Sequence, residues 1–174
     1  MKCSVLGDWC LVPMAAFVLM CGCATDYSWK PSVPEAMRTV SVPTFRNESE
    51  VNELGAVASR QLLREFQREG TFKIRTAGDA ALEIQGVVKS ANYGMAAYDR
   101  HIRGRVAAYE CFAKVEVSVI DKRNRKVLID NRNYRVTTSV TSGQDITTSL
   151  RDASGRLADD LARQVVNDVL NLKW

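Results

Sequence analysis

The residues that most often carry out catalysis are sparse in this chain. His101 is its only histidine, which excludes metal sites and proton relays built from several histidines. Asp99 and His101, with one of the many serines, could form a hydrolytic triad, but no nucleophile elbow and no glycine-rich phosphate loop accompanies them. We therefore expect a non-enzyme without metal or cofactor, and we keep a hydrolase using Asp99 and His101 as the enzymatic alternative.

Clustered cations are the chemical feature that points to a ligand. The first cluster, called the tip cations here, consists of Lys122, Arg123, Arg125 and Lys126. The second consists of Arg100, Arg103 and Arg105. Clustered cations gain most from multivalent phosphate, so the tip cations are predicted to bind an anionic ligand such as a phosphorylated glycolipid. The alternative is that strand ends and hairpin tips are charged for solubility and for protection of sheet edges.

Composition and cysteine position limit the class of protein. The 174 residues, 46% hydrophobic and 25% charged, fit one ordinary domain and exclude wholesale disorder. The net charge of +4 is mild, so an anionic partner has to be argued from local clusters. Four of the five cysteines lie in the first 23 positions, and only Cys111 lies beyond them. The domain therefore has no internal disulfide, and its stability must come from its core.

The N-terminus reads as a targeting segment. The apolar run 11–20 would span about 15 Å as a helix, half the hydrocarbon thickness of a bilayer, and so suits a secretory signal. Gly22 followed by Cys23 resembles a lipobox, at which the cysteine is acylated and becomes the new N-terminus. We expect a signal peptide over 1–22 and a lipidated tether over 23–38. An ordinary cleaved signal or a short anchor remains open. Secretion and the lack of aromatic residues beside the cations both argue against nucleic acid as a partner.

Two segments have the period of an amphipathic helix. The first spans Glu53–Glu69, and its apolar stripe consists of Leu54, Ala58, Leu62 and Phe66. Gly70 follows this segment and is predicted to end the helix. The second spans 146–172, with an apolar stripe that consists of Leu150, Leu157, Leu161, Val165 and Val169.

Alternating apolar residues predict strands between the two helices. The clearest strand is 106–120, in which odd positions are mostly apolar and even positions mostly polar, so one face is buried. Cys111 lies on the apolar face and is predicted to be a buried, inert thiol. Shorter or less regular strands are predicted at 39–43, 72–75, 79–93 and 127–140, with a loop at 95–105, a turn at 121–126 and a bulge near 130–131. The order of elements predicts one α+β domain over 39–174.

Several segments, taken in order, resemble the LptE-like lipopolysaccharide-assembly lipoproteins. They are the lipobox-like Cys23 with Tyr27, TVSVPTFRN at 39–47, LLREFQREG at 62–70, VSVID and KVL at 117–121 and 126–128, and LADDLAR at 157–163 leading to Trp174. The resemblance covers nearly the whole chain after Cys23. One departure is that Arg123-Asn124-Arg125 replaces the usual small turn residue, which makes the tip unusually basic.

The resemblance implies a fold, a partner and a location. The fold is α+β, with an about four-stranded, mainly antiparallel sheet and two amphipathic helices packed on one face. The function is that of an outer-membrane lipoprotein, anchored on the periplasmic side by acyl chains such as palmitate on Cys23. Such proteins assemble with and plug an LptD-like β-barrel translocon, which inserts lipopolysaccharide into the outer leaflet during envelope biogenesis. No catalysis is implied. The alternative is a periplasmic lipoprotein that binds an anionic glycolipid or glycan without a barrel partner.

Overall fold

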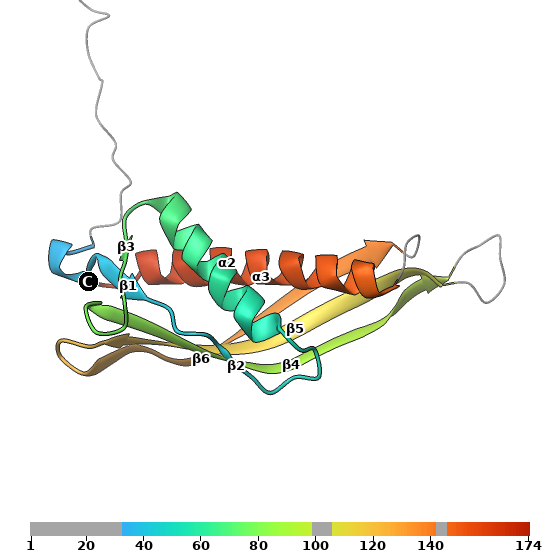
Figure 1. Cartoon of the computed structure of the whole chain (residues 1–174), viewed down its shortest axis with the longest axis horizontal. Coiled ribbons are helices and arrows are strands. Elements are labelled where there is room, and N and C mark those ends of the chain that lie inside the picture. The colour runs from blue at the N-terminus through green and yellow to red at the C-terminus, as the bar shows by residue number, and fades with distance from the viewer. Residues whose placement is uncertain (1–32, 99–105, 142–145) are drawn as a thin grey trace, which may run out of the picture. The chain divides into compact units, whose positions relative to one another are not determined.

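Two helices lie on one face of a twisted sheet in the computed structural model, which describes residues 33–98, 106–141 and 146–174 (Figure 1). All described elements belong to the compact body Pro31–Trp174. In chain order they are η1 (Glu35–Met37), β1 (Thr39–Ser41), β2 (Arg46–Asn47), α2 (Leu54–Glu69), β3 (Lys73–Ile74), β4 (Leu82–Tyr98), β5 (Val106–Asp121), β6 (Lys126–Thr141) and α3 (Ile146–Leu170). The predicted α+β class and both predicted helices are confirmed.

The sheet differs from the prediction of about four mainly antiparallel strands. Within the described residues it has six strands in the order β3-β1-β4-β5-β6, with β2 also paired to β4. The long strands β4, β5 and β6 are antiparallel, but β1 pairs in parallel with both β3 and β4, and β2 pairs in parallel with β4. The sheet is therefore mixed. The short strands predicted at 39–43 and 72–75 are confirmed as β1 and β3, whereas β2 was not predicted. Strand β2 is only two residues long, too short to produce a period-two signal in the sequence.

Helix α2 follows from its apolar spacing. Leu54, Ala58, Leu62 and Phe66 are all buried, so one stripe of the helix faces the core that α2 forms with α3 and the sheet. Gly70 ends the helix in the left-handed conformation, with φ of 83°, and its N–H donates to the carbonyl oxygen of Phe66 at 3.2 Å. The predicted glycine cap is confirmed, because this φ is one that glycine adopts without steric cost.

The long strands follow the predicted alternation. The odd positions of β5 from Cys111 to Val119 are buried, whereas Glu110 and Lys114 on the other face are exposed. Strand β4 continues to Tyr98, so the predicted loop beginning at residue 95 was wrong over 95–98. The predicted bulge is confirmed, because Asp130 and Asn131 both lie opposite Ser118 in the pairing of β5 with β6.

Helix α3 is tied to the edge strand β6 by polar contacts as well as by its apolar stripe. The Tyr134 hydroxyl donates to Asp168 Oδ2 at 2.7 Å, and Arg132 Nη1 lies 3.2 Å from the same carboxylate oxygen. Burial, followed by the hydrogen bond to Asp168, raises the pKa of Tyr134 well above its ordinary value. The phenol therefore stays a neutral donor, and α3 is held in register with β6.

The segment before the first strand also carries structure. Val33 is 2% exposed and belongs to the hydrophobic core, and the short helix η1 follows it. Arg38 Nε donates to the Val33 carbonyl oxygen at 3.1 Å, which folds this segment back on itself. The core thus begins before Thr39, the position at which the sequence pattern first indicates a strand.

Candidate functional site

The hairpin between β5 and β6 presents the tip cations, and Asp121 fixes its shape. The Asp121 side chain is buried, and its Oδ1 accepts the backbone N–H of Arg123 at 2.9 Å and of Asn124 at 3.3 Å. Its Oδ2 accepts Asn124 Nδ2 at 2.8 Å. The next residue, Arg125, has a φ of 54°. One carboxylate therefore organises the whole turn, as aspartate does in Asx-turns.

The electrostatics of Asp121 favour its charged form. Burial raises the pKa of this carboxyl, but the hydrogen bonds from Asn124 and from the backbone of Arg123 outweigh it. The pKa consequently lies below its ordinary value, and Asp121 remains an acceptor at neutral pH. The tip is held in one conformation by a buried anion, which keeps its cations at fixed positions.

Two of the four tip cations turn back onto the protein. Lys122 Nζ lies 2.9 Å from Glu83 Oε2 and also donates to the carbonyl oxygen of Ala77. The hydrogen bond from Lys122, followed by one from Gln85, lowers the pKa of Glu83. Arg123 Nη1 reaches the carbonyl oxygen of Ala36 at 3.5 Å. Lys122 therefore braces the tip against the start of β4 and the turn before it, and Arg123 reaches η1.

The side chains of the other two tip cations have no partner on the described part of the protein. Arg125 and Lys126 are exposed, and neither side chain has a hydrogen-bond or ion-pair partner among the residues that the structure describes. They are adjacent residues, Arg125 at the end of the turn that Asp121 fixes and Lys126 at the start of β6. Of the predicted ligand-binding set, these two offer unsatisfied charge to a ligand, whereas Lys122 and Arg123 serve the fold in this conformation.

The remaining sites predicted from the sequence are placed in part. Cys111 is buried, as predicted, and burial raises the pKa of its thiol despite the nearby charge of Arg156. Cys23, the second basic cluster over 100–105, and the pair Asp99 and His101 lie outside the described residues. Their roles stay predictions.

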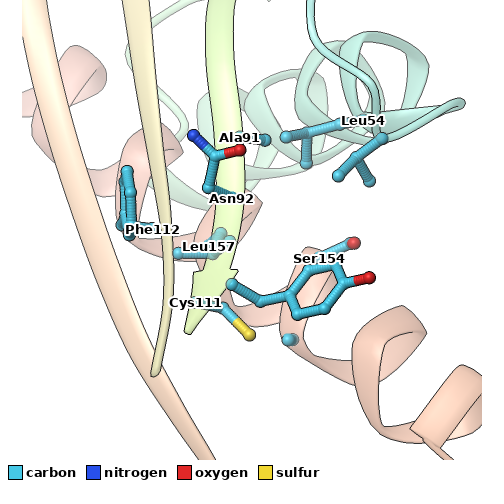
Figure 2. A pocket seen from close by; sticks show the side chains of 10 residues that line it. Leu54, Ala91, Asn92, Cys111, Phe112, Ser154 and Leu157 are labelled. Carbon is cyan, nitrogen blue, oxygen red and sulfur yellow. The ribbon is translucent and has the colours of Figure 1, made fainter. Parts of the chain in front are cut away.

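The sequence patterns missed an apolar hollow at the other end of the sheet. It lies on the helix side of β4 and β5, next to the first turn of α2, and Figure 2 shows its lining. Its lining includes Ala91 from β4, Cys111 from β5, Leu54 from α2 and Leu157 from α3. The signal that could have indicated it is indirect. Strand β4 is long, from Leu82 to Tyr98, and it continues past the point where α2 begins at Leu54 (Figure 1).

The described residues contain neither a metal-binding cluster nor a membrane-spanning helix. No group of three or more histidine, cysteine, aspartate or glutamate side chains there could hold a metal ion. None of the helices in this part of the chain has the length and apolar character that crossing a bilayer requires.

A family model and several solved structures are similar to this chain. The model of the LptE family, described as lipopolysaccharide-assembly, matches residues 37–169. No curated protein matches the chain.

The fold recurs in solved structures at low sequence identity. A hypothetical protein from Chlamydia trachomatis is 14% identical, with a TM-score of 0.56 over 77% of this chain and 96% of its own. A protein from Xanthomonas campestris is 11% identical, with a TM-score of 0.56 over 80% of this chain and 87% of its own. A minor lipoprotein from Acinetobacter baumannii is 13% identical, with a TM-score of 0.46 over 77% of this chain and 93% of its own. The first two show that the α+β arrangement is an established fold.

Proposed function

Because this chain belongs to the LptE family of lipopolysaccharide-assembly proteins, we propose that it is a non-catalytic outer-membrane lipoprotein that assembles with and plugs a β-barrel translocon. The observation that carries the proposal is the family match, which spans residues 37–169 and includes both helices almost completely together with all six strands. Lipidated Cys23 anchors the chain on the periplasmic side of that membrane. The barrel inserts lipopolysaccharide, and this chain keeps the barrel assembled.

The surface of the domain is compatible with the inside of a barrel. The sheet face that points away from the helices (Figure 1) carries polar side chains from all three long strands. They include Gln85, Lys89, Lys114, Glu116, Asn133 and Arg135. Lys89 pairs with Glu116 at 3.4 Å and with Glu48 at 3.2 Å, so acids and bases alternate there. The lumen of a large membrane barrel is polar, and such a face can contact it without burying unpaired apolar surface.

Purification of the full chain from its native envelope tests this function. We expect a large β-barrel protein to co-purify in a fixed ratio, because a plug is held by an extensive interface. Intact mass of the captured chain should equal residues 23–174 plus acyl groups on Cys23. A monomeric chain that carries an anionic glycolipid but no barrel would refute the plug and favour the alternative, a lipoprotein that binds such a ligand alone.

Arg125 and Lys126, the two tip cations whose side chains have no partner in the described part of the chain, are proposed to contact the phosphates of the glycolipid. Arg125→Gln with Lys126→Gln should weaken binding of purified lipopolysaccharide about five- to tenfold at low salt, and less at high salt. Lys122 is left unchanged, because its loss would unpair Glu83 and disturb the tip itself.

The matched control for the tip variant removes the same charge elsewhere. Arg60→Gln with Arg151→Gln neutralises two exposed arginines on the helices. We expect this control to bind lipopolysaccharide within about twofold of the unaltered chain. Equal losses in both double variants would show that net charge, and not the tip, controls the affinity.

A further inference from the structure

We propose that three exposed cations beside the start of the folded domain rest on the anionic phospholipid headgroups of the membrane that anchors the chain. They are Arg38, Lys73 and Arg75, called the entry cations here. The identity of this membrane rests on the lipidation of Cys23 proposed above, whereas the attraction of the entry cations to an anionic lipid surface does not.

The entry cations form one patch at the point where the described chain begins. Arg38 Nε donates to the carbonyl oxygen of Val33, the first residue that the structure describes, at 3.1 Å. The backbone N–H of Lys73 donates to the carbonyl oxygen of Arg38 at 2.7 Å, and that of Arg75 donates to Val40 at 2.9 Å. Alternate residues of an extended segment project to the same side, so Lys73 and Arg75 share a face. Figure 1 shows β1 and β3 together at one end of the sheet.

The side chains of this patch have charge to offer. Lys73 and Arg75 are exposed, and neither side chain has a hydrogen-bond or ion-pair partner among the residues that the structure describes. Arg38 uses Nε on the backbone and keeps the other donors of its guanidinium for a further acceptor. A phosphate at this surface would therefore not have to displace an acidic side chain.

The surrounding charges leave this end of the domain positive. Glu35 and Asp79 are the acids of η1 and of the turn after β3. Arg123 from the hairpin tip reaches the carbonyl oxygen of Ala36 on η1 at 3.5 Å and brings a fourth cation to the same end. A patch with four cations and two acids is attracted to an anionic bilayer, and less so to a neutral one.

The length of the tether determines which surface can reach the entry cations. Cys23 lies ten residues before Val33, and a chain of that length spans at most about 35 Å even when it is fully extended. Acyl chains on Cys23 would hold the membrane surface within that distance of Arg38, which contacts Val33. The headgroups of the anchoring membrane are therefore the anionic surface nearest to the patch.

Side chains in the tether favour the same surface. The residues between Cys23 and Val33 include Tyr27, Trp29 and Lys30. Tyrosine and tryptophan prefer the headgroup level of a bilayer, and lysine is attracted to anionic lipid. A tether that lies in this interface has less slack, so the entry cations are held close to the headgroups.

Small electrostatic gains are sufficient for docking because the chain is already tethered. One lysine or arginine near an anionic bilayer changes an equilibrium about fivefold. Acylation confines the domain to the membrane, so docking is an intramolecular equilibrium that needs no high intrinsic affinity. The three entry cations should therefore favour the docked orientation about 100-fold over an uncharged patch at low salt.

The orientation of the acylated chain on vesicles tests the docking. A fluorescent label is attached at Ala77→Cys, in the exposed turn after Arg75, or at Ser139→Cys, an exposed position at the other end of the sheet. Cys111 is buried, so the unaltered chain should take no label. A nitroxide carried on lipid headgroups quenches labels that lie at the membrane surface.

We expect quenching at residue 77 on vesicles that contain phosphatidylglycerol, and quenching several-fold weaker at high salt. The label at residue 139 should stay unquenched in both. Equal quenching at residue 77 on pure phosphatidylcholine vesicles would show that the tether alone brings this end to the surface, which would overturn the docking. Equal quenching at residues 77 and 139 would overturn it as well.

Charge variants locate the docking in the patch. Lys73→Gln with Arg75→Gln should lower the ratio of docked to undocked chains about 20- to 30-fold, and Arg38 is left unchanged because it bonds the backbone. Lys114→Gln with Arg135→Gln is the matched control, since these are also one exposed lysine and one exposed arginine, opposite each other on β5 and β6. The control should keep the ratio within about twofold. Equal losses in the two double variants would assign the effect to net charge and contradict the proposal.

The result is separable from the function proposed above. The vesicles contain neither lipopolysaccharide nor a barrel, so failure of the plug or of the glycolipid contact would leave the docking standing. An acylated chain that is not quenched at residue 77 would refute the docking and leave the lipid anchor standing. If intact mass shows no acyl group on Cys23, the anchor is refuted, and flotation of the full chain with phosphatidylglycerol vesicles replaces quenching. We then expect salt-sensitive flotation that Lys73→Gln with Arg75→Gln weakens, and a chain that does not float would overturn the proposal.

Discussion

Replacing Phe66 by alanine should lower the free energy of unfolding by about 3–5 kcal/mol, the largest effect expected for any single position in this domain. Phe66 is completely buried on α2 and meets Phe72 edge to face, with ring centroids 5.3 Å apart. Phe72 in turn packs against Trp174, at 6.4 Å between centroids. The substitution therefore leaves a cavity where α2, the segment before β3 and the C-terminus meet.

Urea denaturation monitored by circular dichroism measures the loss at Phe66. Gln67→Ala is the matched control, because Gln67 is the next residue of the same helix and is exposed. Its substitution should change the free energy of unfolding by less than about 0.5 kcal/mol. A loss below about 1 kcal/mol in Phe66→Ala would show that the surrounding side chains collapse into the space, contrary to the packing described here.

Replacing Gly86 by alanine should cost about 1–3 kcal/mol, because there is no room for a single methyl group. A Cβ at this position in β4 would lie 2.4 Å from Cδ2 and Cε2 of Phe45. The Phe45 ring cannot easily withdraw, since it is buried and the backbone N–H of Phe45 donates to Ser59 Oγ at 2.7 Å. The glycine thus exists to admit the ring, and its own φ needs no left-handed freedom.

Gly94→Ala is the control on the same strand, because a Cβ there has no neighbour within 4 Å. Thermal unfolding should show a lower Tm for Gly86→Ala and a Tm within a few degrees of the unaltered protein for Gly94→Ala. In a Phe45→Leu background the additional cost of Gly86→Ala should shrink, since the two substitutions share one contact. Equal losses at both glycines would mean that strand propensity, and not Phe45, sets the cost.

Periodic segments of the sequence were sufficient to predict the layers of the fold. The stripe from Leu54 to Phe66 and the odd positions from Cys111 to Val119 are buried as their spacing predicts. The spacing of apolar residues, 3.6 in a helix and 2 in a strand, determines which face of an element is buried. This spacing can be read without knowing which elements pack together. The bulge at Asp130–Asn131 was also predictable, because the parity of apolar residues changes there.

Strand pairing was not predictable, because it depends on contacts between distant residues. Val40 pairs with both Ile74 and Leu82, which follow it in the sequence only after the whole of α2. Strand β1 itself is only three residues long. A short strand is specified by the neighbours that supply its hydrogen bonds more than by its own composition. The strands at 39–43 and 72–75 were therefore predicted, but their parallel pairing was not, and β2 was missed altogether.

The tip cations show the same limit for the candidate site. Their clustering was visible in the sequence, but the pairing of Lys122 with Glu83, 39 residues earlier, requires the register in which Leu82 lies opposite Asp121. That register decides which tip cations contact the protein, and it leaves the side chains of Arg125 and Lys126 available to a ligand. The hollow near Tyr93 was missed for a related reason, since a space between elements has no signature in any one of them.

Strand β6 ends the sheet in the described part of the chain, and its outer edge offers unpaired N–H and C=O groups over 16 residues, roughly 50 Å. Such an edge can recruit a strand from another copy before the proper partner arrives. Asn131, with a φ of 40°, breaks its regular course, and the exposed Arg135 places like charges where two copies would meet. An edge interrupted and charged in this way protects the chain from self-association while that edge is uncovered.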